Sequence, residues 1–246
     1  MKRIEELKTK IFADGADLAG MLEMYRNPLI KGFTTNPTLM RKAGVTNYRV
    51  FANSVLREIK DRPVCFEVFA DEFAEMEAQA LEIATWGPNV FVKIPVTNTR
   101  REPSAPLIRR LAQGGVRLNV TAVMTLQQVK DIASCLGEAP AAYISLFAGR
   151  VADTGRDPMP IMAEAVEFLH GFPRVELIWA SPRELLNVFH ADAVGCHIIT
   201  VTNDILQKLH LIGKDLDEYS LDTVKMFYDD GRQAGFSLDR AAARAM

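Results

Sequence analysis

The chain has 246 residues, of which 48% are hydrophobic and 24% charged, and its mean hydropathy is +0.01. These values are typical of a globular protein and exclude a disordered chain, a collagen and a coiled coil. The 29 Lys and Arg against 31 Asp and Glu leave a net charge of -2. No overall field therefore attracts nucleic acid or an anionic membrane, and we expect neither as a partner.

Cysteine and histidine usage is equally informative. Cys65, Cys135 and Cys196 are too scattered for a disulfide framework, and the four histidines have no metal-ligand spacing. There is no P-loop and no GxGxxG after a strand, so we expect neither a metal nor a nucleotide cofactor. The N-terminal MKRIEELKTKIF lacks the apolar run of a signal peptide, and no stretch approaches ~18 apolar residues, so we expect a cytoplasmic protein.

Short apolar or β-branched runs recur at regular intervals and alternate with longer amphipathic segments. The runs predict strands at Ile11–Asp14, Gly32–Asn36, Val64–Ala70, Val90–Pro95, Arg117–Ala122, Ala142–Phe147, Val175–Ser181 and His197–Thr202. The segments between them predict helices, as in residues 71–86, where Phe73, Met76, Ala80, Ile83 and Ala84 form one stripe. Eight such units in this length predict a (β/α)8 barrel, with a doubly wound open sheet as the competitor.

Capping signals and the end of the chain complete the expected organisation. Asn36 before Pro37 and Ser181 before Pro182 pair a capping residue with a first-turn proline, and each pair predicts a strand-to-helix loop. The pattern from Leu221 to Ala234 predicts an extra C-terminal helix. We therefore expect one domain over residues 1–246, with the barrel at about 10–212 and a helical extension at about 217–246.

One lysine stands out on the fourth predicted strand. Residues two apart on a strand share a face, so Val90, Val92 and Ile94 should contact the helices while Phe91 and Lys93 point into the barrel. The alternative is a lysine that reaches from the strand edge to solvent. The neighbouring strands favour the buried position, because they carry further polar residues at their carboxyl ends.

The same alternation brings a set of polar side chains to one mouth of the barrel. They are Asp14, Thr34, Asn36, Glu67, Asn119, Thr121, Ser145 and Ser181. Burying each without a partner would cost about 1 to 3 kcal/mol, so their concentration at the usual place for barrel chemistry predicts a site. Taken singly, Thr34 and Thr121 are equally consistent with ordinary strand threonines, and Asn36 is consistent with a helix cap.

A lysine among carboxylates and hydroxyls predicts imine chemistry. Desolvation lowers the pKa of a buried lysine, and the neutral amine can attack a carbonyl to form a Schiff base. The imine then accepts electrons from an adjacent carbon–carbon bond, which requires a base at a substrate hydroxyl and a proton shuttle at the amine. Asp14 and Glu67 are the available carboxylates.

Six stretches resemble the transaldolase family. They are GFTTNPTLM (32–40), FEVFAD (66–71), VKIPVT (92–97), LNVTAVMT (118–125), ISLFAGR (144–150) and ASPRE (180–184). They occur in the family's order between Phe12 and about Thr202, and the TTNP and VKIP elements are specific in combination. The resemblance implies a metal-free (β/α)8 barrel that acts on sugar phosphates such as those of the pentose phosphate pathway.

The resemblance also implies roles for individual residues. Lys93 would form the Schiff base with a ketose donor, Asp14 would be the acid and base at the substrate hydroxyl, and Glu67 with Thr121 would hold the proton-shuttling water. Hydrogen bonds to the donor or the intermediate would come from Thr34, Asn36, Asn119 and Ser145.

Phosphate would bind to Arg150 and Arg183, since a guanidinium clamps phosphate in a forked geometry. The alternative is a surface ion pair, of Arg150 with Asp153 or Asp157 and of Arg183 with Glu184.

Two positions bear on the type of reaction. The family's transferases, which move a dihydroxyacetone unit between sugars, resemble this chain in Glu67 and Phe147, whereas the lyases, notably fructose-6-phosphate aldolase, tend to have Gln and Tyr. Transfer is therefore expected, with the lyase as the alternative and a non-catalytic phosphosugar-binding barrel as a third hypothesis.

The chain also departs from the family around the mouth. TNTRREPSAP follows VKIPVT in place of a Glu-Gly pair, Pro182 replaces an aromatic residue, and ISLF replaces ISPF. An unusual sugar phosphate from a biosynthetic pathway is therefore an alternative substrate. Family members form pentamers, decamers or dimers, so the resemblance also implies a homo-oligomer.

Overall fold

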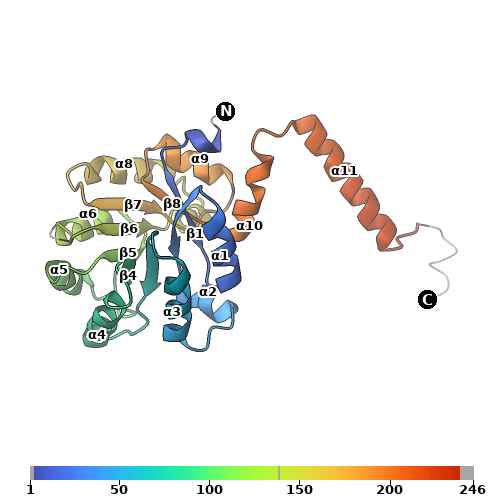
Figure 1. Cartoon of the computed structure of the whole chain (residues 1–246). Coiled ribbons are helices and arrows are strands. Elements are labelled where there is room, and N and C mark those ends of the chain that lie inside the picture. Colours follow the sequence, from blue (N-terminus) through green and yellow to red (C-terminus); the bar gives the residue numbers. More distant parts are fainter. Residues whose placement is uncertain (1–2, 138, 239–246) are drawn as a thin grey trace. The chain divides into compact units, whose positions relative to one another are not determined.

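A computed structural model describes residues 3–137 and 139–238, and its eight strands form a closed parallel barrel (Figure 1). The strands are β1 (Lys10–Asp14), β2 (Ile30–Thr34), β3 (Val64–Glu67), β4 (Val90–Pro95), β5 (Leu118–Val123), β6 (Ala142–Leu146), β7 (Val175–Trp179) and β8 (Ile198–Thr202). Neighbouring strands pair in sequence order, and β8 pairs with β1 from Lys10–Ile198 to Asp14–Thr202. This closure confirms the (β/α)8 barrel and excludes the open sheet.

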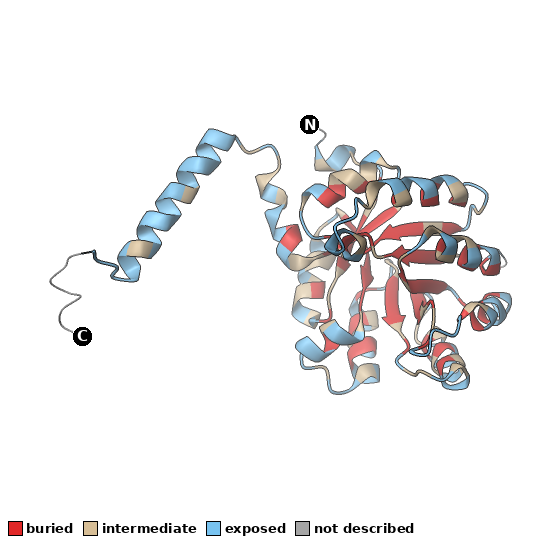
Figure 2. Cartoon of the chain, turned by 180° about the vertical axis from the view of Figure 1, so that it is seen from behind, coloured by how far each residue is buried: buried red, intermediate tan, exposed pale blue. Residues whose placement is uncertain are grey.

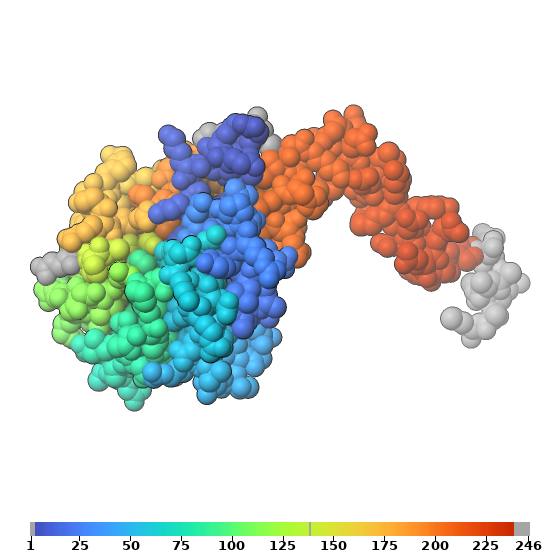
Figure 3. Space-filling view, in the orientation of Figure 1, coloured from blue at the N-terminus to red at the C-terminus, as the bar shows by residue number. Residues whose placement is uncertain are grey.

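Helices connect the strands and cover the barrel, and in the space-filling view the units follow one another around it in sequence order (Figure 3). They are α1 (Leu18–Arg26), α2 (Pro37–Lys42), α3 (Tyr48–Glu58), α4 (Phe73–Ala84), α5 (Ala105–Gln113), α6 (Leu126–Cys135), α7 (Ala148–Asp153), α8 (Met159–Leu169), α9 (Leu186–Ala193) and α10 (Asn203–Leu206), with short 3-10 turns at Ile4–Glu6 and Gln207–Leu211.

Strand alternation sorts the core into two parts. Val90, Val92 and Ile94 belong to the main hydrophobic core, which also contains the buried residues of the helices. Phe91 instead joins a smaller cluster inside the barrel. Figure 2 shows the buried strands enclosed by helices whose outer faces are exposed. The predicted inward and outward faces of the fourth strand are thus confirmed.

The helix predicted in residues 71–86 is α4, and its stripe faces the core. Met76, Ala80 and Ile83 are buried, and Phe73 and Ala84 pack against the core at the two ends. The apolar spacing was sufficient to predict this helix and its buried face, because one side of the helix covers the barrel while the other meets solvent.

Strand ends differ from the predicted ends where another local structure begins. β2 ends at Thr34, because Asn36 caps α2 with its side-chain oxygen, which accepts from the Leu39 N–H at 3.0 Å. β3 ends at Glu67, three residues before the predicted Ala70. Both ends lie at the mouth of the barrel, where the chain leaves the sheet to form loops.

Ser181 and Pro182 lie in a strand-to-helix loop, as predicted, but the prediction that Pro182 belongs to the first turn of the helix was wrong. β7 ends at Trp179, Ser181 has a left-handed φ of 58°, and α9 begins only at Leu186. The Asn187 side chain accepts from the N–H groups of Arg183 and Glu184, which holds the intervening loop. A Cβ on Gly149, in the first turn of α7, would lie 1.5 Å from the Ser181 carbonyl oxygen. The loop after β7 therefore approaches α7 closely at Ser181, a contact that the local capping signal does not contain.

The described residues divide into a compact unit up to Leu209 and a second unit from His210 onward. The second contains α11 (Leu216–Gln233), which confirms the predicted C-terminal helix and starts five residues before Leu221. The Asp215 side chain caps it by accepting from Asp217 and Glu218. Residues 239–246 of the predicted extension lie outside the described residues. Among the described helices, none has the length and apolarity to cross a bilayer.

Candidate active site

The carboxyl ends of the strands surround a cavity of about 510 Å³, as expected for the active face of such a barrel. The predicted site residues that line it are Asp14, Thr34, Asn36, Glu67, Lys93, Thr121, Ser145, Phe147, Arg150, Ser181 and Arg183. Asn119 is fully buried just below and does not line the cavity. The side chains that alternation assigned to one mouth therefore do meet in space.

Lys93 is buried on β4, with 5% of the residue exposed. Its Nζ lies 3.0 Å from Glu67 Oε2 and donates to the main-chain carbonyl of Thr35, also at 3.0 Å. Pairing of Glu67 with Lys93 in the β3–β4 register brings the two side chains together on the interior face. The lysine thus lies between two acceptors instead of reaching solvent.

The prediction of a lowered Lys93 pKa was wrong. Burial is the largest single influence on the Lys93 pKa and lowers it. The charges of Glu67 and Asp14, together with the Glu67 hydrogen bond, outweigh burial and raise the Lys93 pKa above its ordinary 10.5. Ion pairing outweighs desolvation because the carboxylates lie in the same poorly solvated space. The resting side chain is an ammonium ion beside a proton acceptor.

Asp14 lies at the end of β1 and accepts a hydrogen bond from Thr34 Oγ1 at 2.7 Å. Thr34 Oγ1 also lies 2.5 Å from Thr200 Oγ1. Since Thr34 gives its single proton to Asp14, Thr200 must be the donor to Thr34. Burial raises the Asp14 pKa above its ordinary 3.8, while the Lys93 charge and the Thr34 hydrogen bond partly oppose that shift. Asp14 is therefore a more basic carboxylate than an exposed aspartate.

Two buried polar atoms near the cavity have no hydrogen-bond partner among the described residues. Asn119 accepts from Ser145 Oγ at 2.8 Å through its Oδ1, which leaves Nδ2 unpartnered. Thr121 Oγ1 is also unpartnered. Because buried polar groups are normally satisfied, these atoms mark positions where a bound polar molecule would find a donor or acceptor.

The two arginines at the rim make different contacts. Arg183 pairs with Asp153, from α7, and its Nε donates to Asp153 Oδ1 at 2.9 Å, so the predicted alternative partner Glu184 was wrong. The Arg150 guanidinium lies 5.6 Å from the centre of the Phe147 ring, and among the described residues it forms no ion pair with Asp153 or Asp157. Both arginines line the cavity, so either can meet an anion there.

The sequence did not single out three polar residues that line the cavity, Thr38, Lys42 and Thr200. Thr200 was identifiable, because the alternation that selects Asp14 and Thr34 places Ile198 and Thr200 inside the barrel on β8. Lys42, at the end of α2, lines the cavity from a helix and carried no strand-based signal. Among the described residues, no three His, Cys, Asp or Glu side chains are grouped as metal ligands.

The fold and the site together define a (β/α)8-barrel protein whose polar centre lies at the carboxyl ends of its strands. The chain belongs to the Transaldolase/Fructose-6-phosphate aldolase family, whose model matches residues 11–245. This confirms the family resemblance and identifies an enzyme of the transaldolase/aldolase type.

Several relatives and solved structures are similar to the chain. A protein of Dehalococcoides mccartyi named "Probable transaldolase" is 34% identical over 203 residues, which cover 81% of this chain and 89% of its own. Another of that name from Pelotomaculum thermopropionicum is 35% identical over 90% of this chain and 96% of its own. Dihydrodipicolinate synthase from Rhodopseudomonas palustris has a TM-score of 0.59 at 12% identity, over 94% of this chain and 81% of its own, and shares the fold alone.

Proposed function

We propose that this protein is a transaldolase that transfers a dihydroxyacetone unit from a ketose phosphate to an aldose through a Schiff base on Lys93. The observation that carries the proposal is the buried Lys93 ammonium 3.0 Å from Glu67, in a cavity that also contains Asp14. A lysine–carboxylate pair of this kind can pass a proton and expose an amine to a carbonyl substrate.

Imine formation begins with transfer of the Lys93 proton to Glu67. The Nζ lone pair attacks the ketose carbonyl carbon, and the carbonyl oxygen leaves as water after it has been protonated. Because the Lys93 pKa is raised by its carboxylate neighbours, the neutral amine depends on this local acceptor. We assign to Glu67 and Thr121 the water that carries protons in this step, and the presence of both on the cavity wall supports the assignment.

Cleavage is assigned to Asp14. It takes the proton from the substrate hydroxyl, the carbon–oxygen bond becomes an aldehyde carbonyl, and the electrons of the broken carbon–carbon bond move into the imine to give an enamine. The raised Asp14 pKa suits a general base, and the Thr200–Thr34–Asp14 hydrogen bonds hold its carboxylate in place. In the second half-reaction the enamine attacks the acceptor aldehyde, whose oxygen takes that proton back.

Substrate contacts are assigned to the remaining lining residues. Thr34, Asn36 and Ser145, which line the cavity, would bind hydroxyls. Asn119 belongs to the same proposed set, and its Oδ1 accepts from Ser145 just below the cavity. Arg150, Arg183 and Ser181 would bind phosphate at the rim. The fixed pairing of Arg183 with Asp153 favours Arg150 as the stronger phosphate contact, since Arg183 shares its charge with a carboxylate.

Borohydride trapping tests the proposal. Incubation with fructose 6-phosphate and borohydride should add a three-carbon unit to Lys93, detected by peptide mass spectrometry. Lys93→Met should abolish the adduct and lower activity by about 10⁴-fold or more. Lys42→Met, which changes another lysine of the same cavity, should retain it. A ketose and aldose phosphate screen that never yields an adduct would exclude the reaction and leave a binding protein.

A lyase that releases free dihydroxyacetone is the second candidate, because the matching family model covers fructose-6-phosphate aldolase as well as transaldolase. Glu67 and Phe147 support transfer. Exchanging both, Glu67→Gln with Phe147→Tyr, should raise free dihydroxyacetone relative to transferred product, because new hydrogen-bonding groups would reposition the water that protonates the enamine. Full turnover of the unmodified protein without an acceptor would instead establish the lyase.

Self-association belongs to the same proposal. Within the second unit no residue of α11 is buried, and Leu216, Val224, Phe227 and Tyr228 are among its exposed apolar side chains. A second copy of the chain would cover such side chains, in line with the homo-oligomer that the family resemblance implies. Light scattering should report a mass above that of one chain, and Val224→Glu with Phe227→Glu should lower it.

A further inference from the structure

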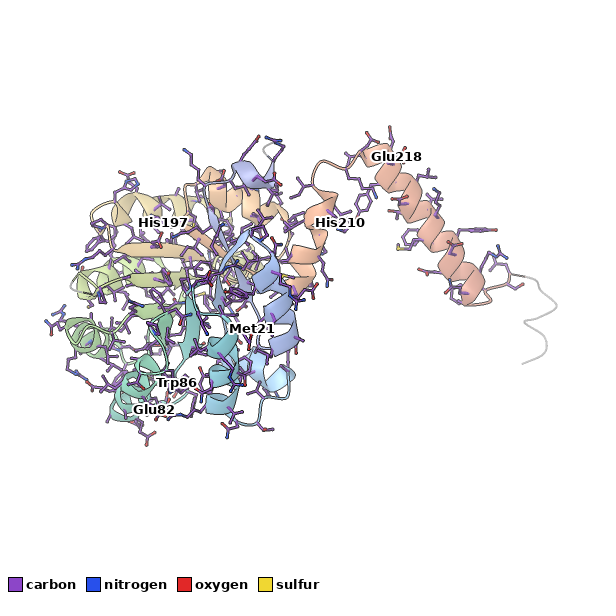
Figure 4. All side chains as sticks on the ribbon, in the orientation of Figure 1. Met21, Glu82, Trp86, His197, His210 and Glu218 are labelled. Carbon is purple, nitrogen blue, oxygen red and sulfur yellow. The ribbon has the colours of Figure 1, made fainter. Side chains whose placement is uncertain are left out.

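Tyr48, the first residue of α3, contacts the chain that carries Glu67. Its hydroxyl donates to the main-chain carbonyl of Glu67 at 2.9 Å. Its ring packs against Phe66 at 6.1 Å, Phe69 at 5.9 Å and Trp86 at 5.3 Å between ring centres. Trp86 lies just after α4 and is labelled in Figure 4. Tyr48 therefore binds the end of β3 through both its hydroxyl and its ring.

The sheet restrains this point of the chain on one side only. The β2–β3 pairing consists of Phe33–Val64 and Thr34–Cys65, so it stops two residues before Glu67. On the other side Glu67 pairs with Lys93 of β4. A second cavity, of about 430 Å³, lies next to Tyr48 and Glu67, and Arg41 and Phe69 help to line it. Glu67 thus lines two cavities, and part of its surroundings is not filled by packed side chains.

Tyr48 also lies near Thr35, whose side chain is one of the groups that influence the Tyr48 pKa. The Thr35 carbonyl accepts from the Lys93 ammonium, and the Thr35 side chain donates to the Cys65 carbonyl at 2.9 Å, two residues before Glu67. Burial raises the Tyr48 pKa, so the phenol keeps its proton and remains a hydrogen-bond donor throughout the working pH range. The hydroxyl therefore fixes the main chain at the point where the β2–β3 ladder has ended.

We infer that Tyr48 is a positioning residue, which fixes the main chain of Glu67 and thereby the distance between the Glu67 carboxylate and Lys93 Nζ. This rests on the proposed function, because it assigns Tyr48 to the imine-forming step. Tyr48 acts through Glu67 and not on the substrate. Proton transfer depends steeply on donor–acceptor geometry, so a loosened Glu67 should slow imine formation more than it affects carbon–carbon cleavage at Asp14.

Tyr48→Phe removes the hydroxyl and keeps the ring. Single-turnover borohydride trapping with fructose 6-phosphate should show imine formation slowed about 10- to 100-fold, with its pH profile shifted. Tyr25→Phe is the matched control, since the Tyr25 hydroxyl donates to Asp61 at 2.6 Å on the exposed surface, and it should leave rate and profile unchanged. Tyr48→Leu also removes the ring packing on Phe66 and Phe69, so it should lower Tm further and slow imine formation at least as much as the Phe variant.

A second measurement does not depend on the reaction. With Glu67 held less firmly, the Lys93 pKa should fall, so reductive methylation of Lys93 with formaldehyde at pH 8 should be several-fold faster in Tyr48→Phe than in wild type. If wild type forms no ketose adduct but Lys93 methylation still changes, the proposed function fails and the positioning role stands. A lower Tm with unchanged imine formation, pH profile and methylation would show that Tyr48 is merely structural.

Discussion

Two layers of the barrel interior lie only two residues apart on the same strands, yet they differ completely in chemistry. The apolar floor and the polar mouth are related strand by strand as Phe12 and Asp14, Cys65 and Glu67, Phe91 and Lys93, Tyr143 and Ser145, and Ile198 and Thr200. The floor is sealed by its own packing, whereas the mouth borders the cavity. Alternation along the strand therefore sets the direction of a side chain, while the position of the residue along the barrel axis sets its role.

Ring packing closes the floor below the mouth. Phe91 stacks on Tyr143 with ring centres 4.2 Å apart, and Phe12 meets Tyr143 edge-on at 5.8 Å. Gly32 leaves room for the Phe12 ring, since a Cβ there would lie 2.5 Å from Phe12 Cζ. We expect changes in the mouth to act on the reaction and changes in the floor to act on stability.

Loss of the Asp14 carboxylate should have the largest effect in this comparison. Asp14→Ala should slow carbon–carbon cleavage by about 10² to 10⁴-fold, as expected for removal of a general base, with imine formation much less affected. Single-turnover trapping compared with aldehyde release separates the two steps. An equal loss in both would contradict the separate roles of Asp14 and Glu67.

The floor should respond in the opposite way. Phe12→Ala removes a ring that is 1% exposed and should lower the free energy of unfolding by about 3 to 5 kcal/mol. Urea unfolding measures this, and kcat of the folded protein should stay within a few-fold of wild type. A catalytic loss as large as that of Asp14→Ala would abolish the distinction between the layers.

Adding a methyl group to the floor should lower the free energy of unfolding less than removing a ring from it. Gly32→Ala places a methyl group against the Phe12 ring and should destabilise by about 1 to 3 kcal/mol. Combining it with Phe12→Leu should recover part of the loss, since the smaller side chain yields space. Additive losses in the urea midpoints of the double variant would show that the two positions are not coupled.

The smallest expected effect is a gain in stability within the mouth. Because burial raises the Asp14 pKa above the unfolded value of 3.8, the folded state disfavours the carboxylate, and this cost appears as pH rises from 3.8 through the folded pKa. Asp14→Asn lacks the charge, so its stability relative to wild type should increase between pH 4 and pH 8. Urea unfolding of both proteins at pH 4 and pH 8 measures this. A difference in free energy of unfolding that is the same at both pH values would contradict a raised Asp14 pKa.

Local sequence patterns were sufficient to predict most of the fold, because they reflect interactions between residues that are close in sequence. The stripe of α4 and the cap at Asn36 are local features, and the structure contains both. Ser181 followed by Pro182 carried a similar capping signal, but the helix begins only at Leu186, and Ser181 packs against Gly149 of α7. A contact between segments about thirty positions apart leaves no periodic trace in either one.

The site was predictable to the extent that it depends on side-chain direction. Alternation selected Lys93, Asp14 and Glu67, and the same rule applied to β8 would have selected Thr200. The pairing of Arg183 with Asp153 was not predictable, since α7 and the loop after β7 meet only in the folded chain.

Residue order and short motifs were enough to predict the eight alternating units, the interior faces of the strands and the family. Three other features depend on contacts between distant segments: β8 closes on β1, Tyr48 binds the Glu67 carbonyl, and the Lys93 pKa rises. A pKa is the sum of opposing effects from groups distant in sequence, so the direction of its shift depends on distances that exist only after folding.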